Sequence, residues 1–130
     1  MSRRVIEIFA NFPTAVFQRD VIAGAREVID QSGYQAAVIE VPVLPVRITD
    51  LPTQGERLAG ALVVTGVLPD AILHELAERA IPLSLVSHQI PGGDIPGVMP
   101  NNRQGIAMLM EHLVVARGCR QPVFIGGILN

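Results

Sequence analysis

Apolar residues are grouped along the chain in short runs that alternate with longer stretches of helical periodicity. Runs that are rich in β-branched residues and bounded by turn residues predict four strands, at residues 5–9, 36–41, 60–65 and 81–86. A further extended segment is expected at residues 96–98, and a last strand is expected to begin at about Val123. Runs this continuous are typical of strands that are buried on both faces of a parallel sheet.

Three stretches between these strands repeat apolar residues at helical spacing. The first ends before Ser32-Gly33, and its predicted inward face is Val21, Ile22, Ala25, Val28 and Ile29. The second begins at Pro69-Asp70, and its predicted inward residues are Ile72, Leu73, Leu76 and Ala80. The third begins at about Arg103 and stops near Gly118, and its predicted buried face is Ile106, Leu109, Met110 and Leu113.

The order of these elements predicts the fold class α/β, with a doubly wound parallel sheet and right-handed crossovers. Between the second and third strands, frequent prolines leave room only for a short helix, at residues 48–51 or 54–58. The length of 130 residues and the hydrophobic content of 49% suffice for one domain with a core.

The charged and reactive residues exclude several classes of function. The net charge is −2, and the basic residues, all of them arginine, are scattered apart from Arg3-Arg4, so no nucleic-acid surface or P-loop lysine is predicted. Cys119 is the single cysteine, which excludes an internal disulfide and predicts a small buried hydrophobe. No histidine pair has metal-ligand spacing, no acid–base pair is recognisable, and Gly92-Gly93 lacks dinucleotide-binding spacing. We therefore predict no metal and no cofactor, and no catalytic group is recognised.

The carboxyl ends of the predicted strands carry polar and aromatic residues, and ligands of open α/β sheets bind at those ends. The expected ligand-binding residues are Asn11, Phe12, Thr14, Phe17, Thr65, Ser87, His88, Asn101 and Gln104. Amides, hydroxyls, an imidazole and aromatic rings suit a sugar or another small polyhydroxylated ligand. Asn101 is equally well explained as a helix cap, and His74 and His112 are expected to be surface or packing residues.

The last helix and its flanks resemble a known family. The segment Asn101-Asn102-Arg103-Gln104-Gly105, followed by Glu111-His112-Leu113, Arg117-Gly118 and residues 122–127, resembles the hinge-side segment of LacI/GalR-type sugar-repressor sensor domains, which have a type I periplasmic-binding-protein fold. Residues 60–65 and 81–86 resemble that family's Asp-Gly-Ile-Ile-Val and Ile-Pro-Val-Val-Leu-Val strands. The resemblance covers residues 5–127, although Asn101 stands where the family more often has Asp, and His88 stands where it often has Asp-Arg.

This resemblance implies the N-terminal, Rossmann-like lobe of an effector-sensing, non-enzymatic domain in residues 1–118. Residues 119–130 are then the first strand of a truncated second lobe. A small-molecule effector in the chemical class of sugars is expected in the cleft between lobes, and a homodimer is expected. DNA is contacted only through a helix-turn-helix that this chain does not contain. Because Glu7 interrupts the first apolar run, no signal peptide or membrane segment is predicted, and a cytoplasmic location is expected.

Two other interpretations remain open at this stage. The same lobe is also suited to be the sensor module of a signalling protein with a different output domain. A small flavodoxin-like or receiver-like enzyme is disfavoured, because the first strand ends without an acidic cluster and no phosphate-cradling loop follows it.

Overall fold

The computed structural model describes residues 3–42, 47, 49, 51 and 55–126. The chain divides into two compact units, Met1–Met99 and Pro100–Asn130. The compact units divide before α3. The expected boundary between two lobes, after residue 118, stays a prediction.

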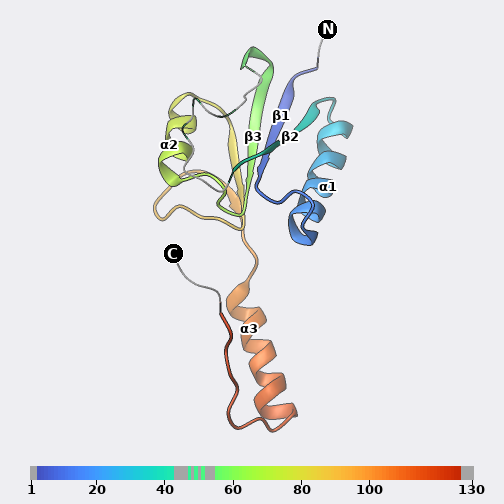
Figure 1. Cartoon of the computed structure of the whole chain (residues 1–130), viewed down its shortest axis with the longest axis vertical. Coiled ribbons are helices and arrows are strands. Elements are labelled where there is room, and N and C mark those ends of the chain that lie inside the picture. The colour runs from blue at the N-terminus through green and yellow to red at the C-terminus, as the bar shows by residue number, and fades with distance from the viewer. Residues whose placement is uncertain (1–2, 43–46, 48, 50, 52–54, 127–130) are drawn as a thin grey trace. The chain divides into compact units, whose positions relative to one another are not determined.

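The first unit contains a five-stranded parallel sheet, which confirms the predicted doubly wound α/β fold class (Figure 1). Its strands are β1 (Val5–Ala10), β2 (Gln35–Glu40), β3 (Leu58–Val64), β4 (Leu83–Val86) and β5 (Gly97–Val98). Its helices are α1 (Val16–Gln31), the short 3₁₀ helix η2 (Gly55–Arg57) and α2 (Asp70–Glu78). The strand order is β2-β1-β3-β4-β5, so the direction of winding reverses between β1 and β3.

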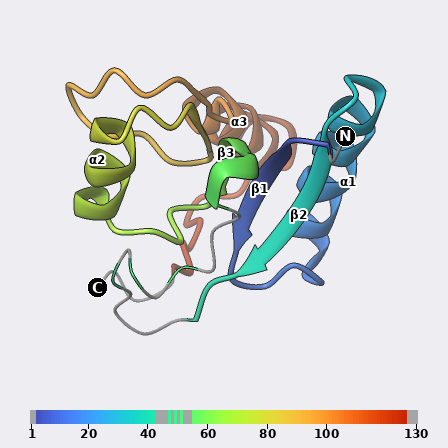
Figure 2. The ribbon, with the colours of Figure 1, turned by 90° about the horizontal axis from the view of Figure 1, so that it is seen from above.

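The two longer helices of this unit cover opposite faces of the sheet, as Figure 2 shows. Side chains of a strand alternate between the two faces, and β1 therefore supplies both cores. Ile8 and Ala10 pack with Ile22 and Ile29 of α1. Phe9 packs in the other core, which includes Leu73 of α2.

The inward face of α1 was predicted correctly in its centre and wrongly at its margin. Ile22 and Ile29 are buried, and Val21 and Ala25 pack against them, but the side chain of Val28 is 63% exposed. Successive helical residues are rotated by about 100°, which places Val28 about 120° away from Ile22 around the axis. Val28 therefore lies outside the stripe that meets the sheet.

The predicted start of α2 is confirmed, with Pro69 as the residue before Asp70. Ile72, Leu73 and Leu76 are buried as expected. The inward position predicted for Ala80 is wrong, because the helix ends at Glu78 and Ala80 lies beyond it, exposed and with φ of 57°. A left-handed residue directly after a helix is a common way to end it, but glycine usually occupies that position.

Replacing Ala80 by glycine is therefore expected to raise the free energy of unfolding by about 1 kcal/mol, because glycine adopts positive φ without the clash of a Cβ atom. Urea-induced unfolding followed by circular dichroism measures the change. Ala77→Gly, an exposed change inside the same helix, should act in the opposite direction by about 1 kcal/mol. A destabilising Ala80→Gly would contradict this interpretation of the turn.

The predictions for the segments that connect the principal strands are confirmed in part. The extended segment expected at residues 96–98 is β5, which pairs with β4 through Leu85↔Gly97 and Val86↔Val98. Of the two short helices considered between β2 and β3, the one at 54–58 corresponds to η2 at Gly55–Arg57, whereas Leu58 already belongs to β3. Of the other, at 48–51, only residues 49 and 51 are described, so the prediction of a helix there stays open.

The second unit begins with α3 (Asn102–Glu111), which continues as the π-helix η3 (His112–Ala116). Gly118 has φ of 67° and ends the helix, as predicted. The wide last turn is closed by the amide of Cys119, which donates to the carbonyl of Leu113 at 2.9 Å.

Two predictions for this unit were wrong. The apolar face of α3 is not buried: the exposed fractions are 52% for Ile106, 59% for Leu109, 37% for Met110 and 39% for Leu113. Within the unit Pro100–Asn130, the described residues after the helix form no second layer that could cover this face. Residues 122–126 form no strand, since a strand needs a hydrogen-bonding neighbour and this unit's described residues supply none.

Candidate functional site

The candidate site lies at the carboxyl ends of β1 and β3, where the winding of the sheet reverses. In open α/β sheets such a reversal leaves a crevice in which ligands bind, because the connections leave β1 and β3 toward opposite faces. Asn11 follows β1 directly, and Thr65 follows β3 directly. Two of the predicted binding residues thus flank the switch point.

Gln18, in the first turn of α1, joins these two residues. Its Nε2 donates to Oδ1 of Asn11 at 2.6 Å and to Oγ1 of Thr65 at 3.1 Å. Its Oε1 accepts from the backbone amide of Phe12 at 3.0 Å. With 7% of its surface exposed, Gln18 is buried but satisfied at both ends of its amide. The network fixes the ends of β1 and β3 and the start of α1 relative to one another.

Gln18 was not among the predicted site residues, although the sequence contained a signal for it. It precedes Ile22 by four residues, which places it about 40° from Ile22 around the helix axis. A polar residue inside an apolar helical stripe needs hydrogen-bond partners at the sheet, because burial of an unpaired amide is costly. The combination indicates a buried polar contact at the strand ends.

The turns after β3 and β4 share an unusual backbone conformation. Thr65 has φ of 56° and Ser87 has φ of 55°, and each follows its strand directly. The amide of Thr65 donates to Val86 O and that of Ser87 donates to Val98 O, both at 2.8 Å. Left-handed conformation in non-glycine residues costs about 1–2 kcal/mol, and such strain is concentrated at functional sites. The hydrogen bonds hold both hydroxyl residues at the carboxyl-end side of the sheet.

His88 is held beside this edge by a contact with α2. Its Nε2 lies 2.9 Å from Oδ1 of Asp70, the first residue of α2. Because an ionised carboxylate only accepts, Nε2 is the donor and Nδ1 is left for other contacts. A Cβ atom added to Gly66 would lie 3.2 Å from Nδ1, so the imidazole packs closely on the Thr65-Gly66 turn. The ring is thereby oriented, although a surface contact of this kind adds little stability.

Three further predicted residues lie on the loop that leaves β1 and on the start of α1. Phe12 and Phe17 are 56% and 51% exposed, and Thr14 is exposed as well. Exposed aromatic rings next to polar groups offer flat apolar surfaces to a ligand that is apolar on one face. The sequence therefore placed these three residues at the expected end of the sheet, with their side chains accessible.

Asn101 and Gln104 belong to the second unit, where they contact each other. Oδ1 of Asn101 accepts from the backbone amide of Gln104 at 3.1 Å, and Nδ2 of Asn101 donates to Oε1 of Gln104 at 3.0 Å. This is the helix-cap role that was one of the two interpretations of Asn101. A role of either side chain in ligand binding stays a prediction.

The donor set of the first unit suits hydrogen bonding to a neutral ligand. Among the described residues, no three His, Cys, Asp or Glu side chains are grouped as metal ligands would be, and no described helix is long and apolar enough to cross a membrane. Cys119 is exposed rather than buried, because the turn after η3 has no covering layer in its own unit.

Comparisons with protein-family models, with curated proteins and with solved structures find no match to the chain.

Proposed function

We propose that the chain is an effector-binding sensor domain of a LacI-type transcriptional regulator and forms one side of a two-lobed cleft. The observation that carries the proposal is the network in which Gln18 joins Asn11 to Thr65 at the switch point of the sheet. The resemblance stated above and the confirmed fold class support it. The proposed effector is a sugar or a related metabolite.

The side chains at the carboxyl ends of the strands favour a polyhydroxylated ligand. Asn11, Thr65 and Ser87 can each donate and accept hydrogen bonds, which matches sugar hydroxyls that do both. Nδ1 of His88 adds a further polar contact, because its other nitrogen is engaged by Asp70. The rings of Phe12 and Phe17 supply apolar surface for the face of a sugar ring.

The proposed mechanism is a population shift in a cytoplasmic homodimer. An effector that contacts both lobes stabilises the closed arrangement, and the equilibrium moves toward the state that it binds better. In the regulator, this change in geometry alters how the DNA-binding heads are positioned. Coupling of this kind is reciprocal, so operator DNA also changes effector affinity.

Isothermal titration calorimetry of this 130-residue chain with a panel of monosaccharides tests the claim that it supplies half a site. A micromolar site corresponds to about −8 kcal/mol, so equal sharing between two lobes leaves about −4 kcal/mol and a Kd of about 1 mM. We expect binding of that strength or weaker. Micromolar binding to this chain alone would show that the site is complete within one lobe.

His88→Ala is expected to weaken the affinity for whichever sugar of that panel binds by about three- to tenfold. This is the effect of losing one neutral hydrogen bond. His74→Ala is the matched control, because His74 is an exposed residue of α2 and should leave affinity unchanged. Chemical-shift titrations by NMR at high sugar concentration measure the Kd of each variant. Equal effects of the two substitutions would remove His88 from the site.

A further inference from the structure

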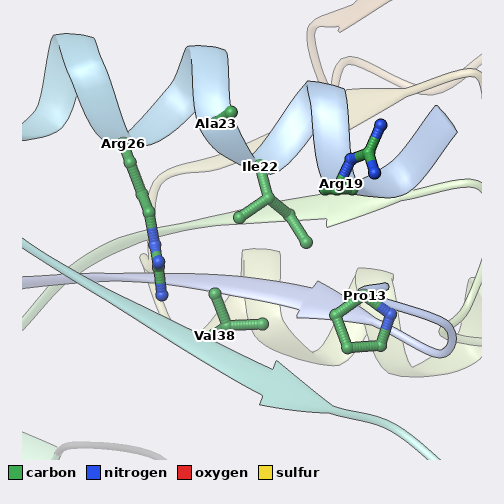
Figure 3. Close-up of a pocket in the computed structure, with 6 residues that line it drawn as sticks. All are labelled: Pro13, Arg19, Ile22, Ala23, Arg26 and Val38. Carbon is green, nitrogen blue, oxygen red and sulfur yellow. The ribbon is translucent and has the colours of Figure 1, made fainter. Parts of the chain in front are cut away.

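A second concave surface lies between α1 and the edge strand β2, and it shares no residue with the candidate site. It encloses about 520 Å³, within the usual range for small-molecule pockets. Its lining residues are Pro13, Arg19, Ile22, Ala23, Arg26 and Val38 (Figure 3). An apolar floor is thus combined with two cationic side chains.

The lining residues of α1 form one face of the helix. Arg19, Ile22, Ala23 and Arg26 are spaced at i, i+3, i+4 and i+7, so they are neighbours along the same side. The seven-residue separation places the Cα atoms of the two arginines about 10 Å apart along the helix axis. Figure 3 shows Arg26 extending from α1 toward β2 beside Val38, whereas Arg19, at the other end of the row, extends away from Val38. Ile22 and Val38 lie between these two ends.

Neither arginine is neutralised by a strong ion pair. Within the part of the chain that the structure describes, Arg26 has no ion pair or hydrogen bond. Arg19 contacts Asp20 at 3.4 Å, with side chains that are 61% and 70% exposed, and exposed pairs of this kind contribute little. Glu27, the residue after Arg26, accepts instead from Gln31. Both guanidinium groups are therefore available to a ligand.

We propose that this pocket binds a linear dicarboxylate with an apolar chain. Guanidinium groups bind carboxylates through paired hydrogen bonds. Arg26 presents this chemistry beside the apolar floor, and the exposed side chain of Arg19 can turn toward the floor from the other end of the row. Because both side chains are exposed, a ligand with carboxylates about 10 Å apart, the rise between the two residues along the helix, can reach both once Arg19 turns toward the floor, and its methylene groups then cover Ile22 and Val38. The pocket shares no lining residue with the proposed sugar site.

Octanedioate is the probe, and ¹H–¹⁵N NMR titration of the full chain measures both its affinity and its location. We expect a Kd of about 1 mM or tighter, with chemical-shift changes centred on α1 and β2. Octanoate should bind more weakly because it has one carboxylate, butanedioate because it is too short, and octane-1,8-diol because it has no charge. Equal binding of the diol and octanedioate, or no binding of octanedioate, overturns the proposal.

Arg26→Gln is expected to weaken octanedioate binding by about tenfold or more, since hydrogen bonds between charged groups are the strong ones. Ala23→Phe, a change at an exposed position, should fill the pocket and abolish binding while the sheet remains folded. Arg79→Gln is the matched control, because Arg79 pairs with Glu75 on α2. Unchanged affinity in Arg26→Gln overturns the proposal, whereas the response to sugars at the strand ends is unaffected by either result.

Discussion

Phe9→Ala is expected to lower the free energy of unfolding of the first unit by about 3–5 kcal/mol. Phe9 lies on β1 in the middle of the sheet, and only 1% of its surface is exposed. It packs in the core that contains Val63 of β3 and Leu73 of α2, so truncation removes contacts with two neighbouring elements and leaves a cavity. The loss approaches the whole stability of a small domain.

Urea-induced unfolding, monitored by far-ultraviolet circular dichroism, measures this effect. Phe12→Ala is the matched control, because the same side chain three residues later is 56% exposed, and its removal should change stability by less than about 0.5 kcal/mol. If both substitutions cost the same, the two faces of β1 are not packed as described. A comparable result for Phe12 would also mean that its ring is covered by protein.

Gln18→Met is expected to cost about 2 kcal/mol, the second largest effect. Methionine has a similar volume, so the change removes hydrogen bonds without opening a cavity. The backbone amide of Phe12 and the side chains of Asn11 and Thr65 lose their partner. Leaving a buried donor or acceptor unsatisfied costs about 1–3 kcal/mol, and the strand ends should become mobile.

Gln31→Met provides the control for this substitution, because Gln31 is an exposed residue at the end of the same helix. It should change stability by less than about 0.5 kcal/mol. Amide hydrogen exchange offers a second readout: Gln18→Met should speed exchange at Phe12, whose amide donates to Gln18. An unchanged exchange rate at Phe12 would contradict the network.

Hydrophobic patterning predicted most helices and strands of the first unit. Its strands are covered on both faces of the sheet, and each of its longer helices is covered on one face, so each type of element leaves its own pattern in the sequence. The four principal strands and the starts of α2 and α3 lie close to their expected positions. The errors at Val28 and Ala80 have local causes, namely the angle around a helix and the point at which a helix ends. Periodicity alone does not determine either one.

In the second unit, hydrophobic patterning predicted the helix correctly but not its burial or the following strand. The sequence predicted the third helix and its stop at Gly118, both of which depend on local signals. Burial of Leu109 and a strand at Val123 depend instead on a covering layer and on a neighbouring strand, and the described residues of Pro100–Asn130 contain neither. Local preferences are readable from one segment, whereas tertiary partners are not.

The candidate site was predictable in position and only partly in composition. The rule that ligands bind at strand carboxyl ends identified Asn11, Thr65 and His88. It did not reveal that Gln18 joins two of them, nor that Thr65 adopts positive φ, because both depend on the register of β1 against β3. A polar residue in a buried stripe was the only sequence signal for the network.

The central claim, that the strand ends on either side of the switch point form the effector surface, is tested most directly by residue-resolved NMR. The measurement is a ¹H–¹⁵N titration of the chain with the tightest-binding sugar of the calorimetric panel. We predict that the largest shift changes fall on Asn11, Gln18, Thr65, Ser87 and His88. Shift changes confined to other surfaces, with these five residues unaffected at saturation, would contradict the account.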